Sequence, residues 1–145
     1  MKVGYIEKEL ALRLATEVHI GQTDLSGHPY IEHIKRVGDK GKTTEEVIVG
    51  YFHDVLEDDA AHPETVEHLN MLFDIQIVEA IKCLTRPSDM DYMDYIKQIK
   101  LNPLATKVKI NDLEDNLSPK RMLKETPGSV RRREKYEKAL EYLKN

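Results

Sequence analysis

A helical repeat of apolar residues runs through most of this chain and limits what it can fold into. Near the N-terminus, apolar residues recur every four positions, on one face of a helix: Ile6, Leu10, Leu14 and Val18. Comparable patterns predict further helices over residues 30–39, 43–56, 63–73, 77–84, 92–101, 103–117 and 129–143. No window alternates between apolar and polar residues for long, as a half-buried strand would. The sequence therefore predicts a compact all-α bundle of seven or eight helices.

Local signals mark where several of these helices begin. Thr43, with Glu46 three residues later, forms a capping box that satisfies free backbone N–H groups of the first turn. Pro63 and Pro103 suit first helical positions, because a proline there has no N–H to leave unpaired. The stretch 21–29 is rich in Gly, Asp, Ser and Pro and is expected to be a loop.

Composition narrows the class of protein. The 145 residues suit one domain, and we treat residues 1–145 as a single unit. With 22 basic and 26 acidic residues, the net charge of −4 gives no overall attraction to nucleic acid. The single cysteine, Cys83, cannot form an internal disulfide, and no apolar segment is long enough to span a membrane. We therefore expect a cytoplasmic domain with neither a nucleic-acid nor a membrane partner.

Titratable residues follow the most apolar part of the chain. His53 and Asp54 come directly after the run 47–52, so they are expected on a mostly buried helix, where unpaired polar groups are costly. Glu57 and Asp58 lie four residues later, on the same helix face. Three carboxylates in one region repel one another, and a multivalent cation would relieve that repulsion. The alternative is a solvated acidic helix end.

Two further candidate ligands lie elsewhere in the sequence. His33 follows Pro29 and Tyr30 on the preceding helix, and Asp112 lies on a late, mostly apolar helix. With His53 and Asp54 they would supply two imidazoles and two carboxylates, a set that suits manganese or iron better than structural zinc. A cation there would make hydroxide available as a nucleophile, with Glu57 and Asp58 orienting water or moving a proton. Alternatively, these residues are buried polar groups that hydrogen-bond to one another.

This pattern resembles the HD-domain metal-dependent phosphohydrolases. More narrowly, it is similar to the hydrolase domain of the RelA/SpoT-type stringent-response enzymes, which remove pyrophosphate from the 3′ position of guanosine tetra- and pentaphosphate, (p)ppGpp. The similar stretches fall within residues 10–117: 19–22, 26–33, 52–58, 84–85 and 108–116. The resemblance implies an HD-like fold and one manganese ion, with iron or cobalt as alternatives, on His33, His53, Asp54 and Asp112. It also implies that Glu57 and Asp58 are the catalytic acidic pair.

The resemblance further implies a small nucleotide as substrate and places Asn116 near it. Ser26 is expected to bind substrate as well. Lys109, one turn before Asp112, either meets a substrate phosphate or pairs with a carboxylate. The run 131–133 of three arginines is interpreted as the basic start of a solvated helix rather than as a phosphate site.

The chain also departs from the family pattern. Asp24 and Leu25 stand where a basic pair usually holds the guanine ring, and Pro119 replaces a small hydroxyl residue. Leu113 and Asp115 replace an arginine and a histidine. The favoured hypothesis is thus a (p)ppGpp 3′-pyrophosphohydrolase. The alternatives are a phosphohydrolase of another nucleotide or phosphorylated metabolite, a non-catalytic nucleotide-binding module, and a structural adaptor. The oligomeric state is left open.

Overall fold

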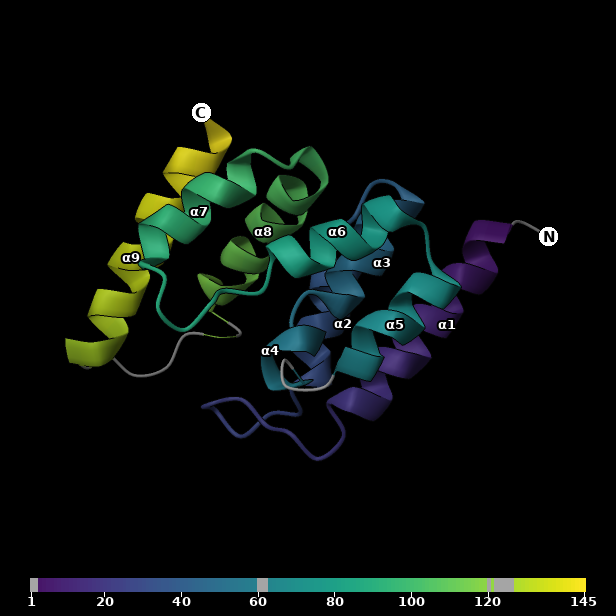
Figure 1. Cartoon of the computed structure of the whole chain (residues 1–145). Coiled ribbons are helices and arrows are strands. Elements are labelled where there is room, and N and C mark those ends of the chain that lie inside the picture. The colour runs from purple at the N-terminus through teal and green to yellow at the C-terminus, as the bar shows by residue number, and fades with distance from the viewer. Residues whose placement is uncertain (1–2, 60–62, 120, 122–126) are drawn as a thin grey trace.

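The structure is a computed structural model that describes residues 3–59, 63–119, 121 and 127–145. Over these ranges the chain forms helices joined by short loops, with an isolated bridge between Thr23 and Pro29 and no strand (Figure 1). The helices are α1 (Val3–Val18), α2 (Ile31–Asp39), α3 (Thr44–Phe52), α4 (Val55–Asp59), α5 (Pro63–Leu72), α6 (Ile75–Cys83), α7 (Tyr92–Lys100), α8 (Pro103–Asn116) and α9 (Pro127–Lys144). The prediction of an all-α fold is confirmed.

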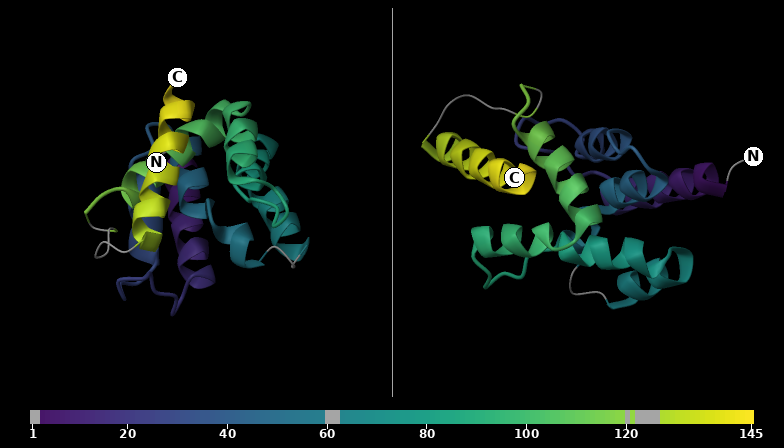
Figure 2. Two further views of the ribbon diagram at one scale, coloured as in Figure 1. Left: turned by 90° about the vertical axis from the view of Figure 1, so that its left-hand side faces the viewer. Right: turned by 90° about the horizontal axis from the view of Figure 1, so that it is seen from above.

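Helices α3 and α8 organise the packing. Helix α3 packs against α1, α2, α6 and α8, and α8 in turn packs against α7 and α9. Helices α1 and α9 therefore lie on opposite sides of the molecule (Figure 2). The core includes fully buried aliphatic side chains from five helices: Ile34, Ile48, Ile81, Ile96, Ile99 and Leu113. Each such burial contributes about 1.5–3 kcal/mol, so these contacts are the main source of stability.

Two glycines allow α2 and α3 to cross closely. A Cβ atom on Gly50 would lie 2.7 Å from the Cα atom of Gly38, and a Cβ atom on Gly38 would lie 2.2 Å from the ring of Tyr51. Neither distance is compatible with a larger side chain in this arrangement. The close crossing brings the end of α3 beside His33, on the buried face of α2.

The features that the sequence predicts at the starts of α3 and α8 are present in the structure. The Thr43 side chain accepts a hydrogen bond from the Glu46 backbone N–H at 3.1 Å, and Glu46 accepts one from the Lys42 N–H, also at 3.1 Å. The capping box is thus confirmed, with the glutamate reaching one residue further back than expected. Helix α8 begins with Pro103 after Asn102, whose side chain accepts from the Ala105 N–H at 3.0 Å.

The helix expected over residues 43–56 is wrong in one respect: it is interrupted at His53 and Asp54. These residues form a turn between α3 and α4. The His53 Nδ1–H donates to the Gly50 carbonyl oxygen at 2.7 Å, which is the oxygen that the Asp54 N–H would use in a continuing helix. The side chain therefore replaces a backbone hydrogen bond and ends α3. Consequently, His53 and Glu57 do not share one helix face.

None of the helices in the described ranges is both long enough and apolar enough to cross a membrane.

Candidate metal centre

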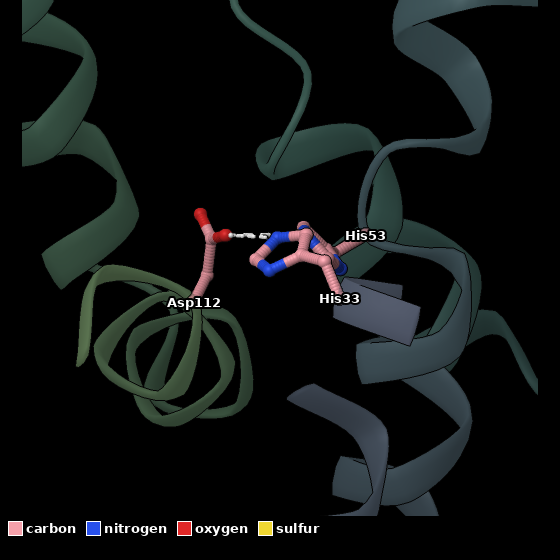
Figure 3. Close-up of side chains that lie close together, drawn as sticks. All are labelled: His33, His53 and Asp112. Atoms are coloured by element: carbon pink, nitrogen blue, oxygen red, sulfur yellow. Dashed lines mark hydrogen bonds and ion pairs between the residues drawn. The ribbon is translucent and has the colours of Figure 1, made fainter. Parts of the chain in front are cut away.

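Three buried side chains from three parts of the fold meet at one point. His33 comes from α2, His53 follows α3, and Asp112 comes from α8 (Figure 3). One potential ligand atom from each lies within 4.8 Å of the others. The Asp112 Oδ1 atom is 3.0 Å from His33 Nε2 and 3.2 Å from His53 Nε2. All three residues are at most 4% exposed. The structure thus brings together three of the four predicted ligands.

Hydrogen bonds fix which nitrogen of each imidazole carries a proton. His33 Nδ1 lies 2.6 Å from Asp115 Oδ2, and His53 Nδ1 lies 2.7 Å from the Gly50 carbonyl oxygen. A carbonyl or an ionised carboxylate can only accept, so both Nδ1 atoms are donors. Asp115 is ionised, because hydrogen bonds from His33 and Arg36 outweigh the effect of burial and hold its pKa well below the usual range. Both Nε2 atoms are left to face Asp112.

The centre consequently places three acceptors against one another. In neutral imidazoles with protonated Nδ1, the two Nε2 atoms present lone pairs to the Asp112 carboxylate. The His53 Nε2 atom is buried and has no partner in hydrogen-bond geometry. Such an arrangement is unfavourable unless a cation lies between the three atoms. The donor set therefore fits a divalent metal, and the buried group of His33, His53 and Asp112 could bind one.

In the metal-free protein a proton takes that place. Burial by itself would lower the pKa of His53, but the negative charges of Asp54 and Asp112 outweigh it and raise the pKa to about 9. Burial would raise the pKa of Asp112, yet Lys109 and His53 hold it well below its usual range. At neutral pH the centre thus contains an ionised Asp112 and a protonated His53.

Asp54 lies at the edge of this group and outside the three-residue cluster. Its Oδ2 atom is 3.5 Å from His53 Nε2 and accepts a hydrogen bond from the Tyr30 hydroxyl. Tyr30 also packs against His33, with 5.4 Å between the ring centroids. Asp54 is partly exposed, so it faces both the buried centre and the solvent.

Of the predicted acidic pair, the structure describes the side chain of Glu57. Glu57 is exposed, and its Oε1 atom accepts from the Arg86 backbone N–H at 3.0 Å, which ties α4 to the loop after α6. Glu57 also lines the cleft above the centre. Asp58 belongs to α4, but its side chain lies outside the part of the chain that the structure describes.

Of the three residues predicted to bind substrate, Lys109 and Asn116 contact Asp112, whereas Ser26 lies in a loop. Lys109 donates to Asp112 Oδ2 at 2.8 Å, and Asn116 Nδ2 donates to Asp112 Oδ1 at 3.2 Å. The carboxylate pairing considered for Lys109 is therefore present, and both residues also line the cleft. Ser26 lies exposed in the 21–29 loop, where its backbone N–H donates to Asp24 Oδ1 at 2.9 Å.

A cleft of about 280 Å³ opens above Asp112 and Asp54. Its lining includes four cations, Arg86, Lys109, Arg121 and Lys135, and four tyrosines, Tyr30, Tyr92, Tyr95 and Tyr136. The Lys135 ammonium lies 4.5 Å from the centroid of the Tyr92 ring. Arg86, Arg121 and Lys135 were not singled out from the sequence, because no periodicity or motif separates them from surface cations. Four cations beside the candidate metal centre suit a ligand with several phosphate groups.

A smaller cavity of about 120 Å³ adjoins this cleft through Asn116, Arg121 and Tyr136, which line both. Asp24 lies there and accepts from the Arg121 guanidinium at 3.3 Å. Arg132 and Arg133 line the same cavity, although Arg132 is exposed like Arg131. The arginine run therefore faces mostly solvent, as expected, with Arg133 half-buried at the cavity.

Comparison with known proteins gives a match at the level of the fold. No protein-family model matches the chain, and no curated protein matches it significantly. A solved structure, described as a metazoan ortholog of SpoT that hydrolyses ppGpp and plays a role in starvation responses, matches with a TM-score of 0.71. The match covers 94% of this chain and 84% of that one, at 17% identity. The chain accordingly has the all-α, HD-like fold that its sequence resemblance implied.

Proposed function

We propose that this protein is a metal-dependent phosphohydrolase of nucleotide polyphosphates, with (p)ppGpp cleaved at its 3′-diphosphate as the favoured substrate. One observation carries the proposal: three buried acceptor atoms converge directly beneath a cleft lined by four cations. The first feature suits a divalent metal, and the second suits a polyphosphate. The likeness in fold to a protein described as hydrolysing ppGpp supports the same reaction class.

In this proposal His33, His53, Asp54 and Asp112 hold the metal. Mn²⁺ is the favoured ion because two imidazoles and two carboxylates suit it, and Fe²⁺ or Co²⁺ would fit the same donors. A divalent cation there supplies hydroxide at neutral pH by lowering the pKa of water. Asp54 would have to exchange the Tyr30 hydroxyl for the cation, a small movement for a side chain that already lies 3.5 Å from His53 Nε2.

The protein's own side chains would bind the phosphates and move the proton. Arg86, Arg121 and Lys135 would neutralise the diphosphate, while Lys109 keeps Asp112 ionised. Glu57 would take a proton from the attacking water and deliver it to the departing 3′ oxygen, and Asp58 is proposed as the second acidic residue of the pair. The bond between phosphorus and the 3′ oxygen breaks, a bond from phosphorus to the water oxygen forms, and pyrophosphate leaves. Ser26 and Asn116 are proposed to contact the nucleoside.

A product assay tests this function. Purified protein is incubated with Mn²⁺ and a panel of nucleotides that includes ppGpp, and pyrophosphate and orthophosphate are measured separately. We expect pyrophosphate from ppGpp. Asp54→Ala is expected to abolish turnover while the helical circular dichroism stays unchanged, whereas Asp89→Ala, in an exposed loop, should retain activity. Binding of nucleotide without product under any metal would instead indicate a non-catalytic module.

The Asp24–Arg121 pair favours a second candidate, a phosphohydrolase of a different nucleotide or phosphorylated metabolite. Asp24 Oδ1 accepts from two backbone N–H groups, and its Oδ2 accepts from Arg121. This carboxylate therefore places a fixed negative charge at the position where the family that this chain resembles has cations that hold guanine. Leu25 beside it is 77% exposed and offers no polar contact to a base. Orthophosphate from other nucleotides, with ppGpp untouched, would support this candidate.

A further inference from the structure

Asp115 contacts the candidate metal centre without belonging to it. It lies one turn after Asp112 on α8 and is 3% exposed. Its Oδ2 atom lies 2.6 Å from His33 Nδ1, on the side of the imidazole that faces away from Asp112. The proposed reaction uses no atom of Asp115, although this position carries a buried carboxylate. A buried charge of this kind is costly unless it is fully paired.

Arg36 completes the pairing of this carboxylate. It lies one turn after His33 on α2, and its Nε donates to Asp115 Oδ1 at 2.8 Å while its Nη2 donates to Oδ2 at 3.1 Å. This two-pronged contact fixes the plane of the carboxylate. Helices α2 and α8 thus face each other with two matched pairs, His33 with Asp112 and Arg36 with Asp115. His33 is the residue that contacts both carboxylates.

We propose that Asp115, held by Arg36, is a positioning residue that keeps the His33 proton on Nδ1 and aims the Nε2 lone pair at the metal. Without a fixed acceptor at Nδ1, the imidazole can carry its proton on Nε2, and such a tautomer cannot bind a cation there. The Gly50 carbonyl does the same for His53. Acceptors of this kind typically change metal affinity by about 10- to 100-fold. The inference rests on the proposed metal site but not on the identity of the substrate.

The test compares Asp115→Asn with Glu114→Gln. Both substitutions remove one negative charge at neighbouring positions of α8. Glu114, however, pairs with Lys144 at 3.1 Å and Lys40 at 4.0 Å on the surface, away from His33. In Asp115→Asn, an amide NH₂ at the Oδ2 position loses the bonds from His33 Nδ1 and Arg36 Nη2, and one at the Oδ1 position loses the bond from Arg36 Nε. In either orientation the two-pronged contact with Arg36 and the negative charge facing His33 Nδ1 are both lost. Mn²⁺ affinity is measured by competition with a chromogenic chelator, and the visible spectrum of the Co²⁺-loaded protein reports on the donor atoms.

We expect Asp115→Asn to lower Mn²⁺ affinity about 10- to 100-fold and to shift the Co²⁺ bands. Glu114→Gln should leave both unchanged. Wild-type affinity in Asp115→Asn, an equal loss in Glu114→Gln, or failure of the wild-type protein to bind metal would overturn the inference. If Asp115→Asn does not fold, Arg36→Gln replaces it, and wild-type affinity in that folded variant overturns the inference too. No readout requires turnover, so a wrong substrate assignment would not be confused with a wrong role for Asp115.

Discussion

Asp112 is the residue on which the centre depends most, because its two oxygens together contact four side chains. Its Oδ1 atom faces both Nε2 atoms and accepts from Asn116, while Oδ2 accepts from Lys109. The lysine is largely but not fully buried beside the carboxylate, and the charge of Asp112 raises its pKa well above the usual value despite that desolvation. The pair therefore remains ionised at any pH where the protein would act. Only the histidine protons are then exchangeable for a metal.

The first prediction concerns that exchange. The pKa of His53 is about 9, so His53 is protonated at pH 7, and a metal must displace its proton. We expect Mn²⁺ binding at pH 7 to release about one proton, and the apparent affinity to rise as the pH increases toward 9 and then to level off. Calorimetric titration in two buffers of different ionisation enthalpy measures the release. The variant His68→Gln, at an exposed position of α5, should release the same amount; an unchanged affinity between pH 6 and 9 would contradict the prediction.

The sequence predicted which residues meet in the buried centre better than it predicted what surrounds them. His53 and Asp112 stand out because they follow or lie within apolar segments, and His33 is a further candidate on the preceding helix. Asp115 was noted only as a departure from a family pattern. Its partners, His33 and Arg36, lie about eighty positions away, and only the crossing of α2 and α8 brings them to it. Residue type thus indicates a ligand, whereas hydrogen-bond partners depend on the tertiary packing.

At the scale of elements, the close crossing of α2 and α3 sets the geometry of the centre. Gly50 takes part twice, since its missing side chain admits Gly38 and its carbonyl oxygen accepts from His53. The periodicity of residues 43–56 predicted one helix and could not reveal the turn at His53. That turn arises from a side-chain hydrogen bond, which an apolar pattern does not encode.

The second prediction follows from this crossing. In Gly50→Ala the new Cβ atom would lie 2.7 Å from the Gly38 backbone, which no side-chain rotation can relieve. We expect a loss of about 1–3 kcal/mol in the free energy of unfolding, measured by urea denaturation, and weaker Mn²⁺ binding. Gly4→Ala is the matched control, because the atoms nearest to its Cβ atom would belong to the Thr44 side chain, which can rotate, and not to backbone. Equal stability of the two variants would show that the crossing is not tight.

The third prediction concerns α9. Lys135 and Lys138 are both exposed, but Lys135 lines the cleft beside Tyr92 and Lys138 does not. We expect Lys135→Ala to raise KM for a polyphosphate substrate several-fold with little change in kcat, and to weaken the dependence of KM on salt. Lys138→Ala should match the wild-type protein. The same KM in both variants would remove α9 from the proposed substrate site.

Across the whole molecule, the candidate ligands join regions far apart in the sequence. His33 and His53 come from the α1–α6 side of the fold, and Asp112 comes from α8, which carries α7 and α9. The all-α class and most helix bounds followed from periodicity, because each helix buries one apolar face. The cleft did not follow, since its lining combines loops and helices whose mutual placement no local pattern specifies.

The fourth prediction tests whether a metal held by these ligands stabilises the whole fold. Because the metal would bind the folded protein and not the unfolded chain, Mn²⁺ at a hundred times its dissociation constant should stabilise the fold by about 2.7 kcal/mol. We expect a concentration-dependent rise in Tm, measured by differential scanning calorimetry. Asp112→Asn should remove the dependence on Mn²⁺ while leaving a cooperative transition. A Tm independent of Mn²⁺ in the wild-type protein would exclude the centre.

The four cleft cations come from four separate stretches of the chain: the loop after α6 (Arg86), α8 (Lys109), the segment after α8 (Arg121) and α9 (Lys135). Replacing one of them need not disturb the backbone that carries the others. If the cleft binds polyphosphates as proposed, single substitutions of Arg86, Arg121 or Lys135 would alter the preference for longer or shorter phosphate chains, while Lys109 and the histidines that would hold the metal stay as they are.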